Sequence, residues 1–200
     1  MPELPEVETV VRDLRPLVVG RTLERLSQGD KQLRRPWLAE WTPAVLGRRV
    51  TQIRRRGKWI MADLDGGATL VVHLGMTGQF TVEKAATPAA SHTHLIFALD
   101  NGDDLRFRDI RRFGSVELFP TAVSVEKMLG EKLGPEPFDL EPKAWRQALR
   151  QTKRPLKAAL LDQALVAGVG NIYADEALYL ARLPPMLSAA ATTAAQAVRS

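Results

Sequence analysis

Residues 94–108 read HLIFALDNGDDLRFR, and this stretch decides the fold that we expect. Two runs suited to β-strands, His94–Leu99 and Asp104–Arg108, flank the dipeptide Asn101-Gly102. Tight hairpin turns favour Asn-Gly because their central positions need positive φ angles, which Asn and Gly tolerate best. The stretch therefore predicts an antiparallel hairpin.

Strand-like segments of similar length continue on both sides of this hairpin. Turn signals such as Asp65-Gly66-Gly67 and Gly75 separate several of them. Many short strands at this spacing predict a sandwich or barrel rather than alternating βαβ units. The further expected strands are Arg21–Leu26, Val50–Ile53, Trp59–Leu64, Ala68–Leu74, Gly78–Val82 and Ser115–Phe119.

A helix is expected before the first strand, over Pro2–Val19, because apolar residues recur there every three or four positions. Pro2 and Pro5 suit the first helical turn, where a missing N–H group costs least. Pro16 is a place where the helix would kink or end early, and otherwise Gly20 would cap it.

The sequence from about Ser124 onward has a helical pattern again. Gly134-Pro135-Glu136-Pro137 reads as the joint between two domains, expected at 1–130 and 131–200. The fold class is then α+β, a β-sandwich with flanking helices followed by a helical domain. A further helix begins in Thr192–Ser200 without a cap, which is typical of a truncated chain. The expected helices of this half are Val125–Leu129, Pro142–Arg150, Pro155–Ala167 and Ile172–Ala181.

Composition narrows the class of protein. The 200 residues are 45% hydrophobic and contain no cysteine, which predicts a globular chain without disulfides or thiolate metal sites. No apolar run is long enough for a membrane span, and the acidic start is unlike a secretory signal. We therefore expect a cytoplasmic protein that does not associate with membranes.

Positive charge is concentrated in two segments of a chain whose net charge is +5. Residues 31–60 hold nine Lys and Arg residues against one acid, and residues 146–157 hold five against none. Such segments are typical of a nucleic-acid partner, although a solvated basic face would have the same composition.

The N-terminal stretch Pro2-Glu3 carries a candidate nucleophile, the amino group of Pro2. Removal of Met1 would leave a secondary amine, and terminal amines have a pKa of about 7.7–8.0, which the following helix would lower. Attack by this amine on a sugar carbon gives an iminium that acts as an electron sink. Glu3 is placed for acid–base chemistry, and Glu6 would orient the amine or cap the helix. A plain helix start remains the alternative reading of these residues alone.

Four turns carry further candidates. Lys58 follows the densest basic cluster, and the turn 73–78 carries His73 at its start and Met76 between two glycines. Phe113 lies beside two arginines and suits insertion between bases. The turn 168–171 ends in Asn171, an N-cap candidate at a helix start that would bind phosphate. Each has a structural alternative, namely a solvated lysine, a core histidine, a core phenylalanine and a simple helical hairpin.

Six motifs follow one another along residues 2 to about 176, in the order PELPEVE, RRGK, HLGMTG, DIRRFG, LGPEP and GVGNIYADE. Together they resemble the formamidopyrimidine-DNA glycosylase family of base-excision repair. The resemblance implies a bifunctional DNA glycosylase and abasic-site lyase for oxidised purines such as 8-oxoguanine and formamidopyrimidines, with cleavage by β- and δ-elimination. It also implies a helix–two-turn–helix motif in the helical domain.

The resemblance also implies roles for individual residues. Pro2 matches the family's nucleophile at C1′, Glu3 its general acid/base, and Lys58 its lysine for phosphate contact and proton donation. The base must be everted because C1′ is inaccessible in a stacked duplex. The remaining implied roles are DNA contacts by His73, His92, Arg111, Lys153 and Asn171, and filling of the vacated space by Met76, Arg111 and Phe113.

The match stops short of the family's C-terminal part. Members normally continue into a four-cysteine zinc finger with a DNA-gripping arginine, so we expect a fragment or a shortened form with no zinc or other cofactor. Damaged double-stranded DNA is the implied partner, and a monomer is expected. Two alternatives stay open: a DNA-binding fragment with weak catalysis, and an endonuclease VIII-like glycosylase for oxidised pyrimidines. Met76 and the spacing of Arg111 and Phe113 favour the purine branch.

Overall fold

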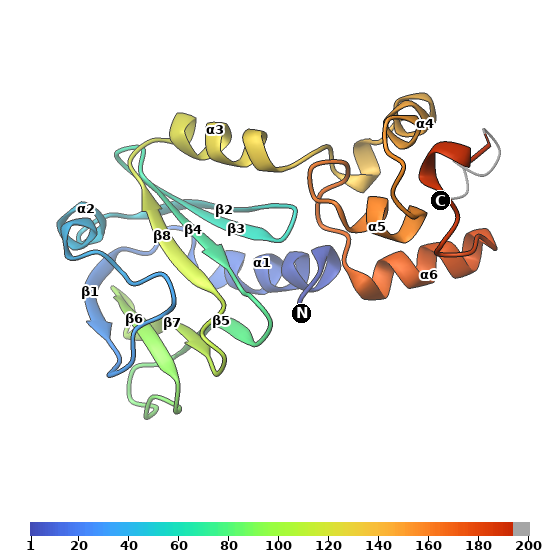
Figure 1. Ribbon diagram of the computed structural model, residues 1–200. Helices are drawn as coiled ribbons and strands as arrows, with labels where there is room; N and C mark the ends of the chain where they lie inside the picture. Colours follow the sequence, from blue (N-terminus) through green and yellow to red (C-terminus); the bar gives the residue numbers. More distant parts are fainter. Residues whose placement is uncertain (194–200) are drawn as a thin grey trace. The chain divides into compact units, whose positions relative to one another are not determined.

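The computed structural model describes residues 1–193 (Figure 1), and the chain divides into two compact units. Unit 1 spans Met1–Met128 and holds all the strands of the described residues, while unit 2 begins at Leu129 and is helical. The helix expected to begin in Thr192–Ser200 lies almost wholly outside the described residues.

Unit 1 is a β-sandwich of two four-stranded antiparallel sheets, with strand orders β1-β6-β7-β5 and β2-β3-β4-β8. The predicted N-terminal sandwich is therefore confirmed, and each expected strand segment has a counterpart. The strands are β1 (Leu23–Gln28), β2 (Val50–Arg56), β3 (Trp59–Leu64), β4 (Thr69–His73), β5 (Gly78–Lys84), β6 (Thr93–Leu99), β7 (Asp103–Asp109) and β8 (Ser115–Phe119).

The hairpin predicted at Asn101-Gly102 joins β6 to β7, with Phe97 opposite Leu105 and Gly102 at φ 80°. Strand residues with fully buried side chains fill the space between the sheets, and this burial is the main favourable contribution to the fold. The largest buried side chains of unit 1 include Phe80, Phe97, Phe107, Ile60, Leu70 and Leu105.

Helix α1 (Leu4–Val18) packs its apolar stripe against β2, β3 and β5, so it contacts edge strands of both sheets. The helix does not end at Pro16, because its last turn buries Val18 completely and the Val19 N–H still bonds the Arg15 carbonyl at 3.2 Å. That burial compensates for the helical hydrogen bond that proline lacks. Two short helices that the sequence did not predict, η1 (Ala39–Trp41) and α2 (Thr42–Val45), follow β1.

The chain passes from unit 1 to unit 2 through α3 (Ala122–Lys132). Unit 2 has its own core, in which Trp145, Leu149, Leu160 and Leu178 are buried. Its elements within residues 129–193 are η2 (Pro137–Asp139), α4 (Pro142–Arg150), α5 (Leu156–Leu161), α6 (Asn171–Ala181) and η3 (Ala189–Ala191).

The helix expected over Pro155–Ala167 is wrong in its second half, because α5 ends at Leu161. Asp162 is extended, and its carboxylate accepts a hydrogen bond from the Ala164 N–H at 3.0 Å. Its carbonyl accepts from Leu165 at 2.9 Å, so a separate turn begins there. An aspartate that bonds nearby backbone amides competes with the helix in this way.

The sandwich topology brings its functional turns to one end. The β4–β5 and β7–β8 connections both cross between the sheets, and the register pairs His73 with Ser115 and Gly78 with Asp109. The β2–β3 turn reaches the same end because Trp59 pairs with His73. Turns that are far apart in the sequence are therefore neighbours in space.

Candidate functional site

The start of α1 is a capping box. Glu3 is the N-cap residue, its side chain accepts from the backbone of Glu6, and Glu6 Oε2 accepts from the Glu3 N–H at 2.9 Å. This contact supports helix capping, one of the two roles considered for Glu6. Pro5 lies in the first turn, whereas Pro2 precedes the N-cap, so its expected place within the helix is wrong. Pro2 is half-buried and Glu3 is 2% exposed.

Lys58 lies in the β2–β3 turn, beside the start of α1. The helix runs antiparallel to β2, since Arg15 bonds the Ile53 carbonyl at 3.4 Å and Glu8 bonds Arg55 at 2.9 Å. Continuing this alignment brings Glu3 to Lys58. Burial lowers the pKa of Lys58 below its usual value, and the charge of Glu3 offsets part of that shift. A carboxylate and an ammonium group therefore flank the place where the chain begins.

His73 ends β4 and is held in one orientation. Its Nδ1 accepts a hydrogen bond from the Gly75 N–H at 3.1 Å, and its ring centroid lies 4.7 Å from that of Trp59. Burial lowers its pKa below the usual value, and the positive charges of Lys58 and Arg35 lower it further. A neutral His73 then carries its proton on Nε2, where it donates to a ligand oxygen.

A pocket of about 570 Å³ opens beside His73. It combines two guanidinium groups, an imidazole and two aromatic rings, a set suited to a phosphate next to a sugar or base. The residues that line it are Arg34, Arg35, Trp59, His73, Phe113, Gly114 and Ser115.

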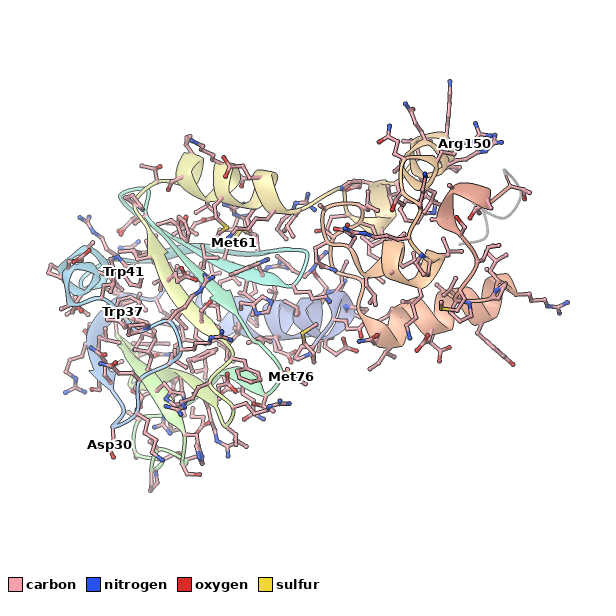
Figure 2. The ribbon with its side chains drawn as sticks, in the orientation of Figure 1. Asp30, Trp37, Trp41, Met61, Met76 and Arg150 are labelled. Atoms are coloured by element: carbon pink, nitrogen blue, oxygen red, sulfur yellow. The ribbon has the colours of Figure 1, made fainter. Side chains whose placement is uncertain are left out.

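Met76, which Figure 2 labels, lies on the β4–β5 turn, and Arg111 and Phe113 lie on the β7–β8 turn. Met76 is 42% and Phe113 47% exposed. The guanidinium carbon of Arg111 is 4.8 Å from the centroid of the Phe113 ring. Gly75 brings the turns together, since a Cβ on it would lie 2.6 Å from the Gly114 nitrogen. The structure thus brings together the two turns that carry the side chains predicted to fill the vacated space.

Asp109 organises these turns, and sequence reasoning missed it. Its carboxylate is fully buried and accepts hydrogen bonds from the Thr77 hydroxyl, the Arg111 N–H at 3.1 Å and the Gly114 N–H at 2.7 Å. The available signal was a single acid between a strand and two arginines, which the sequence alone does not distinguish from a surface residue.

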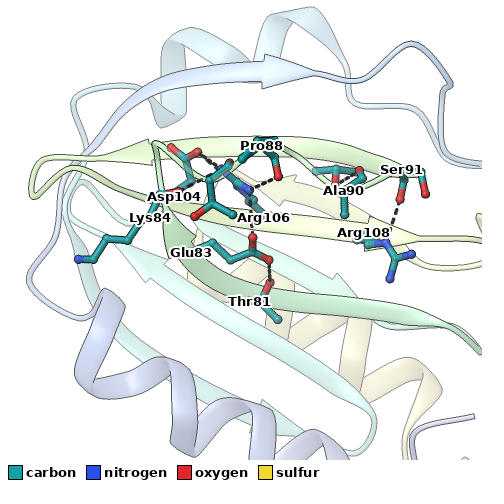
Figure 3. Close-up of polar contacts among 11 residues, drawn as sticks. Thr81, Glu83, Lys84, Pro88, Ala90, Ser91, Asp104, Arg106 and Arg108 are labelled. Atoms are coloured by element: carbon teal, nitrogen blue, oxygen red, sulfur yellow. Dashed lines mark hydrogen bonds and ion pairs between the residues drawn. The ribbon is translucent and has the colours of Figure 1, made fainter.

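His92 lies at the same end, just before β6, and is exposed. Its φ is 67°, unusual for a residue with a side chain, and its carbonyl accepts from the Asp109 N–H at 3.0 Å. The preceding loop is tied to β7 by two arginines (Figure 3). Arg106 is buried and bonds the Thr87 carbonyl at 2.7 Å, and Arg108 bonds the Ser91 carbonyl at 2.8 Å.

The remaining predicted residues, Lys153 and Asn171, belong to unit 2 and are exposed. Lys153 lies between α4 and α5. The expectation that Asn171 caps α6 is wrong, because the extended Gly170 is the N-cap and Asn171 is the first helical residue. Asn171 therefore presents its side chain from the first turn of the helix.

Gln163 shapes the turn before Asn171 and was also missed from the sequence. Its amide nitrogen donates to the Val169 carbonyl at 2.8 Å, and its amide oxygen accepts from the Gly168 N–H at 2.9 Å. Gly168 has a φ of 90°, a conformation that glycine adopts without strain.

Residues 1–193 offer neither a cluster of metal ligands nor a membrane-spanning helix. Within them, no three His, Asp or Glu side chains gather in a way that would hold a metal ion, and the sequence has no cysteine. No helix in this part of the chain is long and apolar enough to cross a membrane.

The sequence matches two family models. Residues 1–116 match the formamidopyrimidine-DNA glycosylase N-terminal domain, and residues 133–199 match the H2TH domain of the same enzymes. The chain belongs to the formamidopyrimidine-DNA glycosylase family. The resemblance of the six motifs to this family of DNA glycosylases is thereby confirmed.

Relatives in this family match along nearly the whole chain. It is 45% identical over 199 residues to the formamidopyrimidine-DNA glycosylase of Chloroflexus aurantiacus, covering 98% of this chain and 71% of the relative. It is 47% identical over 195 residues to that of Herpetosiphon aurantiacus, covering 94% and 70%.

Solved family members have the same fold. The Lactococcus lactis Fpg in complex with DNA containing an abasic site matches with a TM-score of 0.91 at 32% identity, covering 98% of this chain and 73% of that one. The MutM (Fpg) protein of Thermus thermophilus matches with a TM-score of 0.84 at 43% identity, covering 99% and 71%. The predicted fold class is therefore confirmed.

Proposed function

We propose that this member of the DNA glycosylase family excises oxidised purines, 8-oxoguanine and formamidopyrimidines, from duplex DNA and then cuts the abasic strand, acting as a monomer. Pro2, freed by removal of Met1, is the nucleophile. The observation that carries the proposal is the arrangement at the start of α1, where Pro2 adjoins the buried Glu3 and the alignment of α1 with β2 brings Lys58 alongside.

The first step replaces the glycosidic bond. The Pro2 nitrogen attacks C1′ of the damaged nucleotide, and the bond from C1′ to the base breaks as the base leaves with a proton. Glu3 then supplies a proton to O4′ as the sugar ring opens, which leaves an iminium between Pro2 and C1′. A secondary amine suits this step, since its iminium has no N–H proton to lose and remains cationic.

The second step uses the iminium as an electron sink. Loss of a proton from C2′ drives departure of the 3′ phosphate in β-elimination, and a second elimination releases the 5′ phosphate. Lys58 contacts the phosphate and supplies a proton to a departing group. The lowered pKa of Lys58 favours this role, since a less basic ammonium gives up its proton more readily.

We assign DNA binding to the end of unit 1 that carries the β4–β5 and β7–β8 turns and, separately, to the start of α6 in unit 2. His73 and the adjacent pocket suit a backbone phosphate, and His92, Lys153 and Asn171 are exposed for further contacts. Met76, Arg111 and Phe113 would fill the space of the everted base, as apolar wedges do in bent duplexes. Solved complexes of the Lactococcus lactis relative contain Fapy-dG DNA and abasic-site DNA, which supports this substrate class.

The test is single-turnover cleavage of a duplex with one 8-oxoguanine, followed on a denaturing gel. We expect Pro2→Gly and Glu3→Gln each to slow base excision at least about 100-fold. The Gln side chain keeps an oxygen that accepts the helix-capping hydrogen bond, so loss of activity in Glu3→Gln reports on the carboxyl group.

Pro5→Ala is the matched control, because it removes a proline from the first turn of α1, three residues beyond the nucleophile, and should keep rates within about twofold. Wild-type rates in Pro2→Gly would overturn the proposal. Duplex binding by the wild type without any strand cleavage would support the binding-fragment alternative instead.

A further inference from the structure

His94, the second residue of β6, is buried and makes two contacts that the proposed chemistry does not use. Its Nδ1 lies 2.8 Å from the carbonyl oxygen of Lys31, and its Nε2 lies 2.8 Å from that of Asp109. A neutral imidazole carries one N–H, so it donates to only one of two carbonyls. The second nitrogen would then point a lone pair at an oxygen, whereas an imidazolium donates to both.

Charged groups of both signs surround His94. The Asp109 carboxylate is fully buried and accepts three hydrogen bonds, and it belongs to the residue whose carbonyl oxygen His94 contacts. Asp30, Lys31 and His92 line the groove that also contacts His94. A buried cation is tolerated only near a compensating acid, and Asp109 is the buried acid of this set.

The two carbonyls belong to segments that bear on the site. Lys31 begins the stretch that carries the pocket arginines, and Asp109 begins the loop that carries Arg111 and Phe113. Two other contacts join these segments, Arg112 to the Gln32 carbonyl at 3.3 Å and the Arg34 N–H to the Arg112 carbonyl at 3.4 Å. The first of these is exposed, and both are longer than the contacts of His94.

We propose that His94 is a positioning residue whose imidazolium ties the Lys31 segment to Asp109 and so holds Arg111 and Phe113 where they fill the space of an everted base. The effect on base eversion rests on the proposed function, whereas the charge state of His94 is testable without DNA. Its effect is on eversion of a damaged base rather than on the attack at C1′, because the segments that it joins carry Arg111 and Phe113 rather than Pro2.

The first test is nuclear magnetic resonance of protein labelled with ¹⁵N in histidine. The chain has three histidines, so His94→Gln assigns the signals by difference. We expect both ring nitrogens of His94 to carry protons at neutral pH in the DNA-free protein. A single neutral tautomer there would overturn the proposal.

The second test compares two DNA substrates in His94→Phe and His94→Gln. Phenylalanine removes both hydrogen bonds, and glutamine keeps one donor near the position of Nε2. We expect kcat for 8-oxoguanine excision to fall about 30-fold in the first and less in the second, because small displacements of positioning groups have effects of this order. Borohydride trapping on a preformed abasic site, which has no base to evert, should stay within about threefold of wild type.

Thr51→Val is the matched control, since it removes the hydrogen bond from the Thr51 hydroxyl to the Asp63 carbonyl at 3.1 Å, near the start of β2, and should leave both rates unchanged. Excision at the wild-type rate in His94→Phe would overturn the proposal. Equal loss on both substrates would also overturn it, because His94 would then only support folding. If the wild type itself forms no adduct with abasic DNA, the proposed function fails, and the resonance experiment still decides the charge of His94.

Discussion

His73 combines a lowered pKa with a hydrogen bond that depends on its neutral form. Nδ1 accepts from the Gly75 N–H, so protonation of that nitrogen breaks the contact. Because the folded-state pKa is below that of the unfolded chain, the unfolded state binds more protons between the two values. The contribution of His73 to stability is therefore present above the unfolded pKa of about 6.5 and is lost as pH falls through the folded value.

This predicts the behaviour of His73→Asn, whose side-chain oxygen would accept the same N–H without titrating. As pH falls from about 7 to 5, the free energy of unfolding should decrease more in the wild type than in His73→Asn. Urea unfolding at each pH measures it, and other titrating groups cancel in the comparison. A difference that does not change with pH would contradict the assignment.

Lys58→Arg separates the two roles given to this residue. Arginine keeps a positive charge for phosphate but does not give up a proton at accessible pH. We expect binding to an uncleavable abasic-analogue duplex within about threefold of wild type, and strand cleavage slower by about 100-fold.

The pH–rate profile gives a second reading of Lys58. If Lys58 donates a proton, the wild-type rate falls as pH rises through a pKa below its usual value of 10.5, and this alkaline decline is missing in Lys58→Arg. Cleavage by Lys58→Arg at the wild-type rate would show that the residue contributes charge alone.

The contact between the β4–β5 and β7–β8 turns leaves no room for one added methyl group at Gly75. Gly75 has a φ of 61°, and a Cβ there would also lie 2.7 Å from the Phe113 carbonyl carbon. Gly75→Ala should cost about 2–4 kcal/mol of stability, through strain at positive φ and a backbone clash, and should slow excision.

Gly67→Ala is the control, because its φ is 89° and nothing lies within 4 Å of the added Cβ. It has the backbone strain without the clash and should cost about 1–2 kcal/mol. Urea unfolding measures both costs. Equal costs at the two positions would contradict the close packing of the turns.

The strands were predictable because their pattern is local, with short apolar runs separated by glycine and asparagine turns. The end of α5 was not, since the competing hydrogen bonds of Asp162 are not distinguishable in sequence from those of a helical aspartate. The candidate catalytic residues Pro2, Glu3 and Lys58 could be found from residue type and motif. Asp109, His94 and Gln163 did not, because their importance comes from backbone groups that only the folded chain brings near them.

For the whole molecule, the count of basic residues overstates the charge available to DNA. Arg54 pairs with Asp63 at 2.7 Å and with Glu126 at 2.8 Å, which raises the pKa of its guanidinium group. Arg55 pairs with Glu8 at 2.9 Å. Part of the segment 31–60 therefore holds α1 and α3 to the sandwich, and Arg34, Arg35 and Lys58 are the members that line or adjoin the site.

Borohydride trapping with peptide mapping shows whether the chain's own amino terminus attacks the DNA. The protein is incubated with a duplex containing one abasic site, reduced, digested with trypsin and analysed by mass spectrometry. We expect a reduced adduct on the peptide that begins at Pro2 and ends at Arg12, with Met1 absent. An adduct on a peptide containing Lys58, or no adduct on a chain that lacks Met1, would contradict this expectation.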